Sequence, residues 1–258
     1  MTTLRAELWL ADCGETVSPA WEGSQLALLS ESERHRYQAF LRPERRRQFL
    51  VGRILLRHAL SEMFGGTPAM WRLCERLGGA PSLESATPHP VAFSLSHSRD
   101  QVACLLAVGA RVGVDIEYAG RQRDCVRMAA HVFHPENARQ LQSLGAEERI
   151  TEFYRFWTLY EAASKACNGC TRARDAHARR STSEPRLACG AAELGTYRLA
   201  LAICGDVRPP KSLRRFHAPG TIAMQESVTW DHPGAECADR ERLRALVLTP
   251  CSGTYAAV

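Results

Sequence analysis

The hexamer Val-Gly-Val-Asp-Ile-Glu at residues 112–117 constrains the fold most, because it combines a buried-strand pattern with two acidic side chains. Side chains alternate across a β-strand, so Val114 and Ile116 are expected to face the core. Asp115 and Glu117 then share the opposite face, where two carboxylates repel unless a cation lies between them or water screens them. The hexamer alone leaves two interpretations open. One is a Mg²⁺ site, since Mg²⁺ prefers hard oxygen ligands, and the other is an edge strand with a solvated acidic face.

Hydrophobic periodicity divides the chain into helices, strands, helices and strands in that order. This order predicts an α+β (α/β) fold of two halves, residues 1–110 and 111–258, whose junction lies beside the acidic strand, where ligand clefts tend to form. Helices are expected over residues 26–60, with a break at Pro43, and from about Cys125 to Cys167. Strands are expected near 71–74 and at 91–98, 101–110, 111–120, 195–205, 220–230 and 242–250, and residues 168–190 are predicted to be irregular.

Composition favours a globular protein. With 45% hydrophobic and 24% charged residues, the 258-residue chain can bury a sizeable core. The N-terminal apolar run is too short for a signal peptide, and no run approaches the ~18 apolar residues of a membrane-spanning helix. We therefore expect a cytoplasmic protein with no membrane partner. Of the ten cysteines only Cys167 and Cys170 form a C-x-x-C pair, so mostly reduced, buried thiols are expected, with a redox or metal pair as the alternative.

The net charge of +5 is carried almost entirely by arginine, since lysine occurs only at Lys165 and Lys211. A basic surface favours a phosphate-bearing ligand or an acidic partner, although a solvated surface explains the charge equally well. Nucleic-acid binding through the arginine clusters 42–57 and 172–180 is a further hypothesis. The lack of a recognisable nucleic-acid-reading module argues against it.

Two further elements carry polar side chains at informative spacing. In the predicted helix 147–167, Glu161 and Lys165 are one turn apart. This is the spacing of an ordinary helix ion pair, but a compact ammonium in an arginine-rich chain also suits a phosphate ligand. In "SLSHS" at 94–98, His97 lies among apolar neighbours, which is typical of a structural histidine. The alternating serine hydroxyls, with His97, can instead surround a phosphate.

In this order the three elements resemble the motifs of the 4′-phosphopantetheinyl transferases of the Sfp type. The family pattern is a Ser-His-Ser strand, then G-[VI]-D-[IV]-E, then W-[ST]-x-K-E-[AS]-x-x-K. Here these motifs are "SLSHS" (94–98), "VGVDIE" (112–117) and "WTLYEAASK" (157–165). Upstream, "FLRPERRRQFLVGRILLR" is similar to the family's arginine-rich helix and "GGAPSL" to its G-K-P loop, so that about residues 30–165 match in pattern.

The resemblance implies a fold of two similar α/β halves related by a pseudo-twofold, with coenzyme A in the groove between them. It also implies an activity, that of a holo-[acyl-carrier-protein] synthase. A serine hydroxyl of an apo acyl or peptidyl carrier protein attacks the β-phosphorus of coenzyme A, giving holo-carrier and 3′,5′-ADP. Carrier proteins present acidic helices, which suits an arginine-rich surface. The two-half architecture makes a monomer natural, and the sequence does not indicate which pathway is served.

The resemblance also implies residue roles. Asp115, Glu117 and Glu161 would hold Mg²⁺, or Mn²⁺, against the diphosphate of coenzyme A, with Asp115, Glu161 and Lys165 as the catalytic set. The serine proton passes either to Glu161 or to a water molecule beside the ion. The residues implied to contact coenzyme A are Lys165, Ser96, His97, Arg47 and Arg53, with Arg46 as a further candidate for the 3′-phosphate.

Three departures from the family pattern suggest an alternative function. Tyr160 stands where the family has lysine before the helix glutamate, and Ala80 stands for the lysine of G-K-P. Residues 167–186 replace the family's G-x-G-L segment, either as a flexible basic loop that binds an acidic carrier or as a plain linker. The alternative is a degenerate family member that binds coenzyme A or a carrier without turnover.

Overall fold

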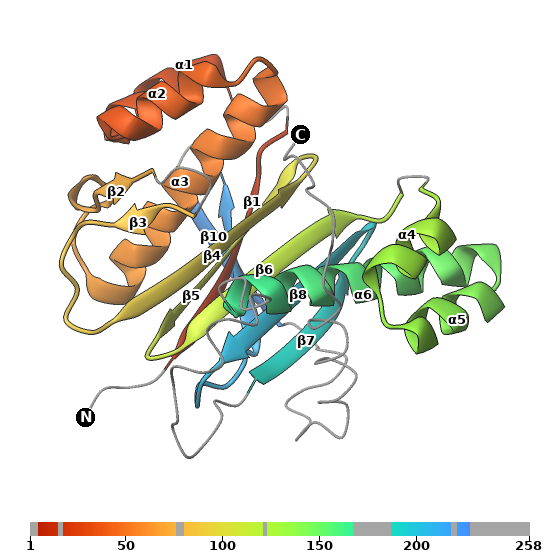
Figure 1. Cartoon of the computed structure of the whole chain (residues 1–258). Coiled ribbons are helices and arrows are strands. Elements are labelled where there is room, and N and C mark those ends of the chain that lie inside the picture. Colours follow the sequence, from red (N-terminus) through yellow and green to blue (C-terminus); the bar gives the residue numbers. More distant parts are fainter. Residues whose placement is uncertain are drawn as a thin grey trace.

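The computed structural model describes residues 5–14, 18–75, 80–120, 123–167, 187–217 and 221–227 of the chain (Figure 1). Its helices are α1 (Pro19–Gln25), η1 (Leu26–Leu28), α2 (Glu31–Ala39), α3 (Pro43–Phe64), η2 (Pro68–Met70), α4 (Cys125–Val132), α5 (Pro135–Ser143) and α6 (Ala146–Ala166). Its strands are β1 (Ala6–Asp12), β2 (Leu73–Cys74), β3 (Ser82–Leu83), β4 (Val91–Ser98), β5 (Gln101–Val108), β6 (Arg111–Tyr118), β7 (Leu187–Leu194), β8 (Tyr197–Cys204), β9 (Ser212–His217) and β10 (Thr221–Ser227).

A five-stranded sheet in the order β10-β9-β1-β5-β4 forms one side of the molecule. β1 lies at its centre, antiparallel to β5 and parallel to β9. The long helix α3 covers one face of this sheet (Figure 1). Trp9 of β1, Leu55 of α3 and Leu106 of β5 are each fully buried in the shared core. This packing fixes the α3 side chains that face β4, which form part of the site.

A second sheet, in the order β6-β8-β7, carries helix α6 on one face. Gly113 of β6 explains how closely the two elements approach. A Cβ atom at this position would lie 1.9 Å from the carbonyl oxygen of Ala162, so only glycine lets the α6 backbone reach the strand. The helix presents small, fully buried residues there, Ala162, Ala163 and Ala166. Gly113 thereby holds α6 directly beside the two acidic positions of β6.

The two sheets share a core. Leu8 and Leu105 from the first sheet pack in one cluster with Val114, Ile116 and Leu201 from the second. The predicted orientation of β6 is confirmed, since Val114 and Ile116 are 0% and 1% exposed. The predicted α+β class is also confirmed. The pseudo-twofold and the boundary at residue 110 stay predictions, although β9 and β10, from beyond that boundary, complete the sheet that begins with β1.

Most of the expected elements occur where they were predicted. The strand predictions at 91–98, 101–110 and 111–120 match β4, β5 and β6, and the helix break at Pro43 falls between α2 and α3. The prediction of irregular structure is wrong for residues 187–190, which begin β7. The prediction for 242–250 lies outside the described residues. β1 and β9 were not predicted.

Five of the seven described cysteines are buried, in agreement with the expectation of mostly buried thiols. Cys170 of the C-x-x-C pair lies outside the described residues. None of the helices in the described ranges has both the length and the apolar composition needed to cross a membrane.

Candidate active site

The two sheets meet along β4 and β6, where serine hydroxyls take the place of a backbone ladder. β6 pairs with β8 along one edge, so the amide groups on its other edge need acceptors. Three alternating hydroxyls of β4 supply them, and we call Ser94, Ser96 and Ser98 the serine ladder. The backbone N–H groups of Val114, Ile116 and Tyr118 donate to Ser94, Ser96 and Ser98 over 3.1, 3.3 and 3.1 Å.

Two hydroxyls of the serine ladder also donate to the acidic side chains of β6. Ser96 Oγ donates to Asp115 Oδ1 at 2.8 Å, and Ser98 Oγ donates to Glu117 Oε2 at 2.9 Å. Each of these hydroxyls therefore accepts from an amide and donates to a carboxylate, which uses both of its hydrogen-bonding functions. The orientation of both carboxylates thus depends on the alignment of the two sheets.

Asp115 has two oxygens in different situations. Lys165 Nζ donates to Oδ1 at 2.8 Å and to the carbonyl oxygen of Val114 at 2.9 Å. The Oδ2 atom of Asp115 is buried and has no hydrogen-bond partner among the described residues. A buried carboxylate oxygen without a partner is costly in a folded protein and calls for a ligand at that position.

Three acidic side chains, Asp115, Glu117 and Glu161, form what we call the carboxylate group. Burial, and next the charge of Asp115, raise the pKa of Glu117 and of Glu161 above their ordinary values. Lys165 lowers both pKa values but does not cancel the effect. The β6 strand and the α6 helix therefore bring three acids into one electrostatic environment, while their joint role as metal ligands stays a prediction.

The carboxylate group suits a divalent cation by its chemistry. Carboxylate oxygens are hard ligands, mutual repulsion disfavours their joint ionisation, and Asp115 Oδ2 has no other partner. Within the described ranges, however, no three potential ligand side chains are gathered closely enough to hold a metal ion. The ammonium of Lys165 is the cation that contacts Asp115 in this arrangement.

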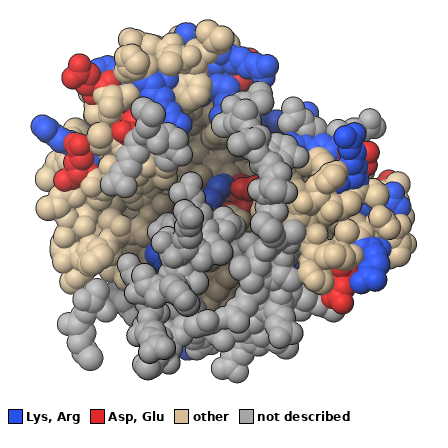
Figure 2. Space-filling view, in the orientation of Figure 1, with Lys and Arg blue, Asp and Glu red and all other residues tan. Residues whose placement is uncertain are grey.

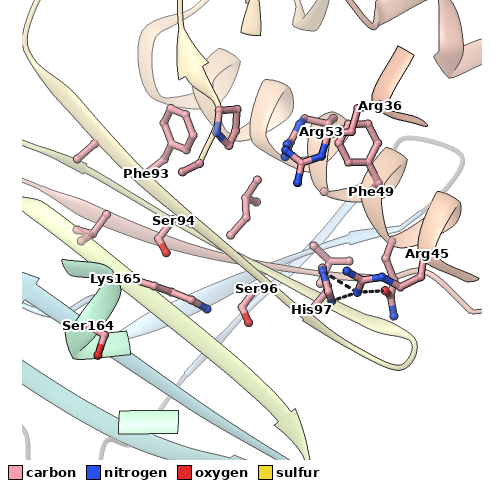
Figure 3. Close-up of a pocket in the computed structure, with 18 of the residues that line it drawn as sticks. Arg36, Arg45, Phe49, Arg53, Phe93, Ser94, Ser96, His97, Ser164 and Lys165 are labelled. Atoms are coloured by element: carbon pink, nitrogen blue, oxygen red, sulfur yellow. Dashed lines mark hydrogen bonds between the residues drawn. The ribbon is translucent and has the colours of Figure 1, made fainter. Parts of the chain in front are cut away.

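A cavity of about 1000 Å³ opens in front of Lys165 and the serine ladder. Figure 2 shows a recess on this face with basic and acidic side chains close together in its depth. On the side of α2 and α3 it is lined by three guanidinium groups, those of Arg36, Arg45 and Arg53, which we call the arginine wall. Figure 3 places this wall across the cavity from Lys165, with Ser96 and His97 between them. No carboxylate is among the described residues that line the cavity, so it favours anions.

His97 lies beside the arginine wall, 3.0 Å from Arg45 Nη1 (Figure 3). Although this residue is exposed to the solvent of the cavity, desolvation of its ring, and next the charge of Arg45, lower the pKa of His97. The neutral ring can accept from Arg45 through one nitrogen and donate toward a ligand through the other. His97 therefore suits an anion without adding a charge of its own.

The structure brings together most of the residues that the sequence indicated, and it separates a few. Lys165, Ser96, His97 and Arg53 line the cavity. Arg47 is not among the lining residues; it lies near Cys13, where its charge partly offsets the raised pKa of the thiol. Arg46 Nε donates to the carbonyl oxygen of Phe40.

Sequence reasoning missed Arg36, Arg45 and the role of Ser98. Arg45 lies one turn before Phe49 and two turns before Gly52, on the stripe of α3 that faces the cavity, so helical spacing from Arg53 was a usable signal. Arg36 is on a different helix, and no local pattern indicated its place.

Comparisons with known proteins agree with this geometry. The sequence profile of the 4′-phosphopantetheinyl transferase superfamily matches residues 111–202. Over these residues the chain is similar to this superfamily. The matched range contains the carboxylate group and Lys165, on β6 and α6, whereas the arginine wall lies outside it.

Several curated relatives carry the same family name. The 4′-phosphopantetheinyl transferase HetI of Nostoc is 33% identical over 141 residues, which cover 54% of this chain and 60% of the relative. The 4′-phosphopantetheinyl transferase AcpT of Salmonella typhi is 36% identical over 129 residues, covering 48% and 60%, and that of Escherichia coli K12 is 32% identical over 126 residues, with the same coverage. The chain thus spans about three fifths of the length of these relatives.

Proposed function

We propose that this protein transfers the 4′-phosphopantetheine arm of coenzyme A to a serine of an apo acyl or peptidyl carrier protein. The observation that carries the proposal is a cavity lined by cationic side chains, whose Lys165 and Ser96 both donate to Asp115 of the carboxylate group. The arginine wall and Lys165 provide two separate cationic ends, which suits a ligand with a diphosphate and a second phosphate, as coenzyme A has.

The residues at the Lys165 end would act on the diphosphate. Asp115, Glu117 and Glu161 would hold Mg²⁺, which supplies charge neutralisation for the transferred and leaving phosphates when bound. Ser96 and Ser98 orient Asp115 and Glu117, and Lys165 can move from Asp115 to a phosphate oxygen because its side chain is 31% exposed.

The chemical step breaks one bond and makes one. The serine oxygen of the carrier bonds to the β-phosphorus of coenzyme A, and the bond from that phosphorus to the bridging oxygen breaks, releasing 3′,5′-ADP. Either Glu161 or a water molecule beside the ion would accept the serine proton; burial, and next the charge of Asp115, raise the pKa of Glu161 and so favour its protonated form. Lys165 and the arginine wall would stabilise the negative charge of the leaving bisphosphate.

The test is an incubation with coenzyme A, Mg²⁺ and a panel of apo carrier proteins, followed by intact-protein mass spectrometry. We expect one carrier or more to gain the mass of one phosphopantetheine arm, and Asp115→Ala to abolish the gain. The absence of any gain across the panel, with a protein shown to be folded, would defeat the proposal.

A second candidate is a family member that binds coenzyme A or a carrier without turnover. It is favoured by Ala80, which lines the cavity where the family pattern has a lysine, and by the Lys165–Asp115 ion pair. Tyr160 packs against Phe133 in the aromatic cluster of α4 and α6 and so supplies no cation to the cavity. This candidate predicts that coenzyme A raises the unfolding temperature while no carrier gains mass.

A further inference from the structure

Two residues of the arginine wall are held by one carboxylate that lies behind it. Glu75, which follows β2, accepts from Arg53 through Oε1, at 2.9 Å from Nε and 2.6 Å from Nη2. Its Oε2 accepts from Arg36 Nη1 in a short charge-assisted hydrogen bond. Glu75 is not among the residues that line the cavity, whereas both arginines are. A single carboxylate thus joins guanidinium groups from α2 and α3.

Glu75 is itself fixed in place. Its backbone N–H donates to Ser32 Oγ at 3.3 Å, which ties the end of β2 to the first turn of α2. Its side chain is only 9% exposed. Hydrogen bonds of the Glu75 backbone and side chain therefore fix the end of β2, helix α2 and helix α3 relative to one another.

A second, fully buried ion pair lies behind Arg53. Glu33 accepts from Arg57 at 3.0 and 2.6 Å, and Arg53 Nε lies 3.5 Å from Glu33 Oε1. The Glu33 and Arg57 side chains are 0% and 1% exposed, and Arg53 also lies over the ring of Phe49 at 4.5 Å. Arg53 is held from three sides, so its guanidinium can present only one edge to the cavity.

The side chains of Arg36 and Arg53 differ in their exposure to solvent. The Arg53 side chain is 8% exposed, while that of Arg36 is 44% exposed. Burial lowers the pKa of Arg53, while Glu75 and Glu33 raise it and the positive charge of Arg36 adds a smaller lowering. This network holds three guanidinium groups, those of Arg36, Arg53 and Arg57, and two carboxylates, those of Glu33 and Glu75. One net positive charge therefore remains for a ligand.

We propose that Glu75 is a positioning residue that holds Arg36 and Arg53 as one paired subsite for a phosphate group, at the end of the cavity opposite Lys165. The proposal rests on the proposed function, in that this phosphate is the 3′-phosphate of coenzyme A. Arg53 is the more buried member of the pair, and Arg36 contacts the phosphate through its remaining N–H groups while its Nη1 stays bonded to Glu75. Glu75 thereby confers selectivity for ligands that carry this phosphate.

The experiment compares two nucleotides that differ only in the 3′-phosphate, 3′,5′-ADP and 5′-AMP, by isothermal titration calorimetry. Glu75→Gln keeps the shape of the side chain and removes its charge. We expect the affinity for 3′,5′-ADP to fall about tenfold, the scale of one hydrogen bond to a charged group, and the affinity for 5′-AMP to change less than about twofold. A merely structural role would weaken both nucleotides equally.

Glu62→Gln is the matched control, since it breaks the Arg214–Glu62 ion pair, whose atoms are 3.1 Å apart, on residues that do not line the cavity. It should leave both affinities unchanged. If Glu75→Gln does not fold, Glu75→Asp keeps the charge and shortens its reach, and it should lower the affinity for 3′,5′-ADP alone. The pair Glu75→Gln and Arg36→Gln should also be non-additive for 3′,5′-ADP, because both changes disrupt the same subsite.

Three results would overturn the proposal: tighter binding of 3′,5′-ADP by Glu75→Gln, equal losses for the two nucleotides, or a wild-type protein that does not prefer 3′,5′-ADP. These outcomes are separate from the carrier assay. A wild type that modifies carriers while Glu75→Gln shows no selective loss refutes the role of Glu75 alone. Selective loss in a protein that modifies no carrier supports the role of Glu75 and refutes transfer.

Discussion

Individual hydroxyl groups connect the two sheets to the acidic side chains of the site. Ser96 accepts from the amide of Ile116 and donates to Asp115 Oδ1, and it is 8% exposed. Removing this hydroxyl leaves the buried Ile116 amide without its acceptor and leaves Asp115 Oδ1 with Lys165 as its remaining donor. We expect Ser96→Ala to lower the free energy of unfolding by about 1 to 3 kcal/mol in chemical denaturation and to reduce transfer strongly.

Ser94→Ala is the matched control for this prediction. Ser94 is 7% exposed and accepts from the amide of Val114 at 3.1 Å, but it makes no hydrogen bond to the carboxylate group. The Ser94→Ala variant should lose about as much free energy of unfolding as Ser96→Ala, and it should retain most of the transfer rate of the wild type. Equal losses of rate in the two variants would show that Ser96 does not act through Asp115.

Glu161 gives a prediction about pH and stability. Its pKa in the folded protein is raised above the ordinary value of 4.5, mainly by burial and by Asp115. Between the unfolded and the folded pKa the folded state binds more protons, so stability falls as pH rises through this window. Glu161→Gln removes that penalty. We expect the variant to be more stable than the wild type at neutral pH, with the difference vanishing below pH 4.5, and to be inactive.

The measurement is the urea midpoint of both proteins at several pH values, together with the carrier assay. A variant less stable than the wild type at neutral pH would show that Glu161 is held by favourable contacts. Gain of stability with loss of activity is typical of residues retained for function.

The sequence could predict the direction of these side chains but not their partners. Alternation along 112–117 was enough to place Asp115 and Glu117 on one face, because it depends only on strand geometry. The serines were interpreted as phosphate contacts, whereas their hydroxyls bond to β6. That role depends on which strand lies beside β4, and no local pattern carries this information.

At the scale of elements, the site depends on how closely α6 approaches β6. Gly113 permits this approach, since a Cβ there would lie 1.9 Å from the Ala162 carbonyl oxygen. We expect Gly113→Ala to lower the free energy of unfolding by about 3 kcal/mol and to move Glu161 and Lys165 away from Asp115. Denaturation curves and the carrier assay should both report the loss.

Gly23→Ala serves as the comparison for Gly113→Ala. Gly23 lies inside α1, and a Cβ there would meet nothing within 4 Å. Alanine is the better helix former, so this variant should be as stable as the wild type or more stable by up to about 1 kcal/mol. A neutral Gly113→Ala would contradict the close packing of α6 on β6.

Elements with strong periodicity were predictable, and elements defined by their tertiary neighbours were not. β4, β5 and β6 alternate clearly and follow one another through short turns, and α6 carries an apolar stripe. β7 has the sequence Leu-Ala-Cys-Gly-Ala-Ala-Glu-Leu, whose small residues lack strand propensity, and it forms because β8 pairs with it. β1 is apolar on both faces because it is the centre of a sheet covered on both sides, which removes the alternation that marks a strand.

At the scale of the whole molecule, the site is assembled from both parts of the chain. The cations of α2 and α3 face Lys165 of α6 across the cavity, and the serine ladder of β4 joins them to the carboxylate group of β6. The arginine wall and the serine ladder come from the chain before residue 110, and the carboxylate group and Lys165 come from the chain after it. We therefore predict that binding of coenzyme A depends on a divalent ion at the carboxylate group and on the arginine wall at the opposite end of the cavity.

The most direct test of the central claim is calorimetric titration of coenzyme A with and without Mg²⁺, on the wild type and on Asp115→Asn. We predict that Mg²⁺ tightens binding of coenzyme A to the wild type by about tenfold or more, and that Asp115→Asn abolishes this gain while keeping the affinity measured without the ion. An affinity of the wild type that is the same with and without Mg²⁺ would contradict the claim that Asp115, Glu117 and Glu161 share one ion.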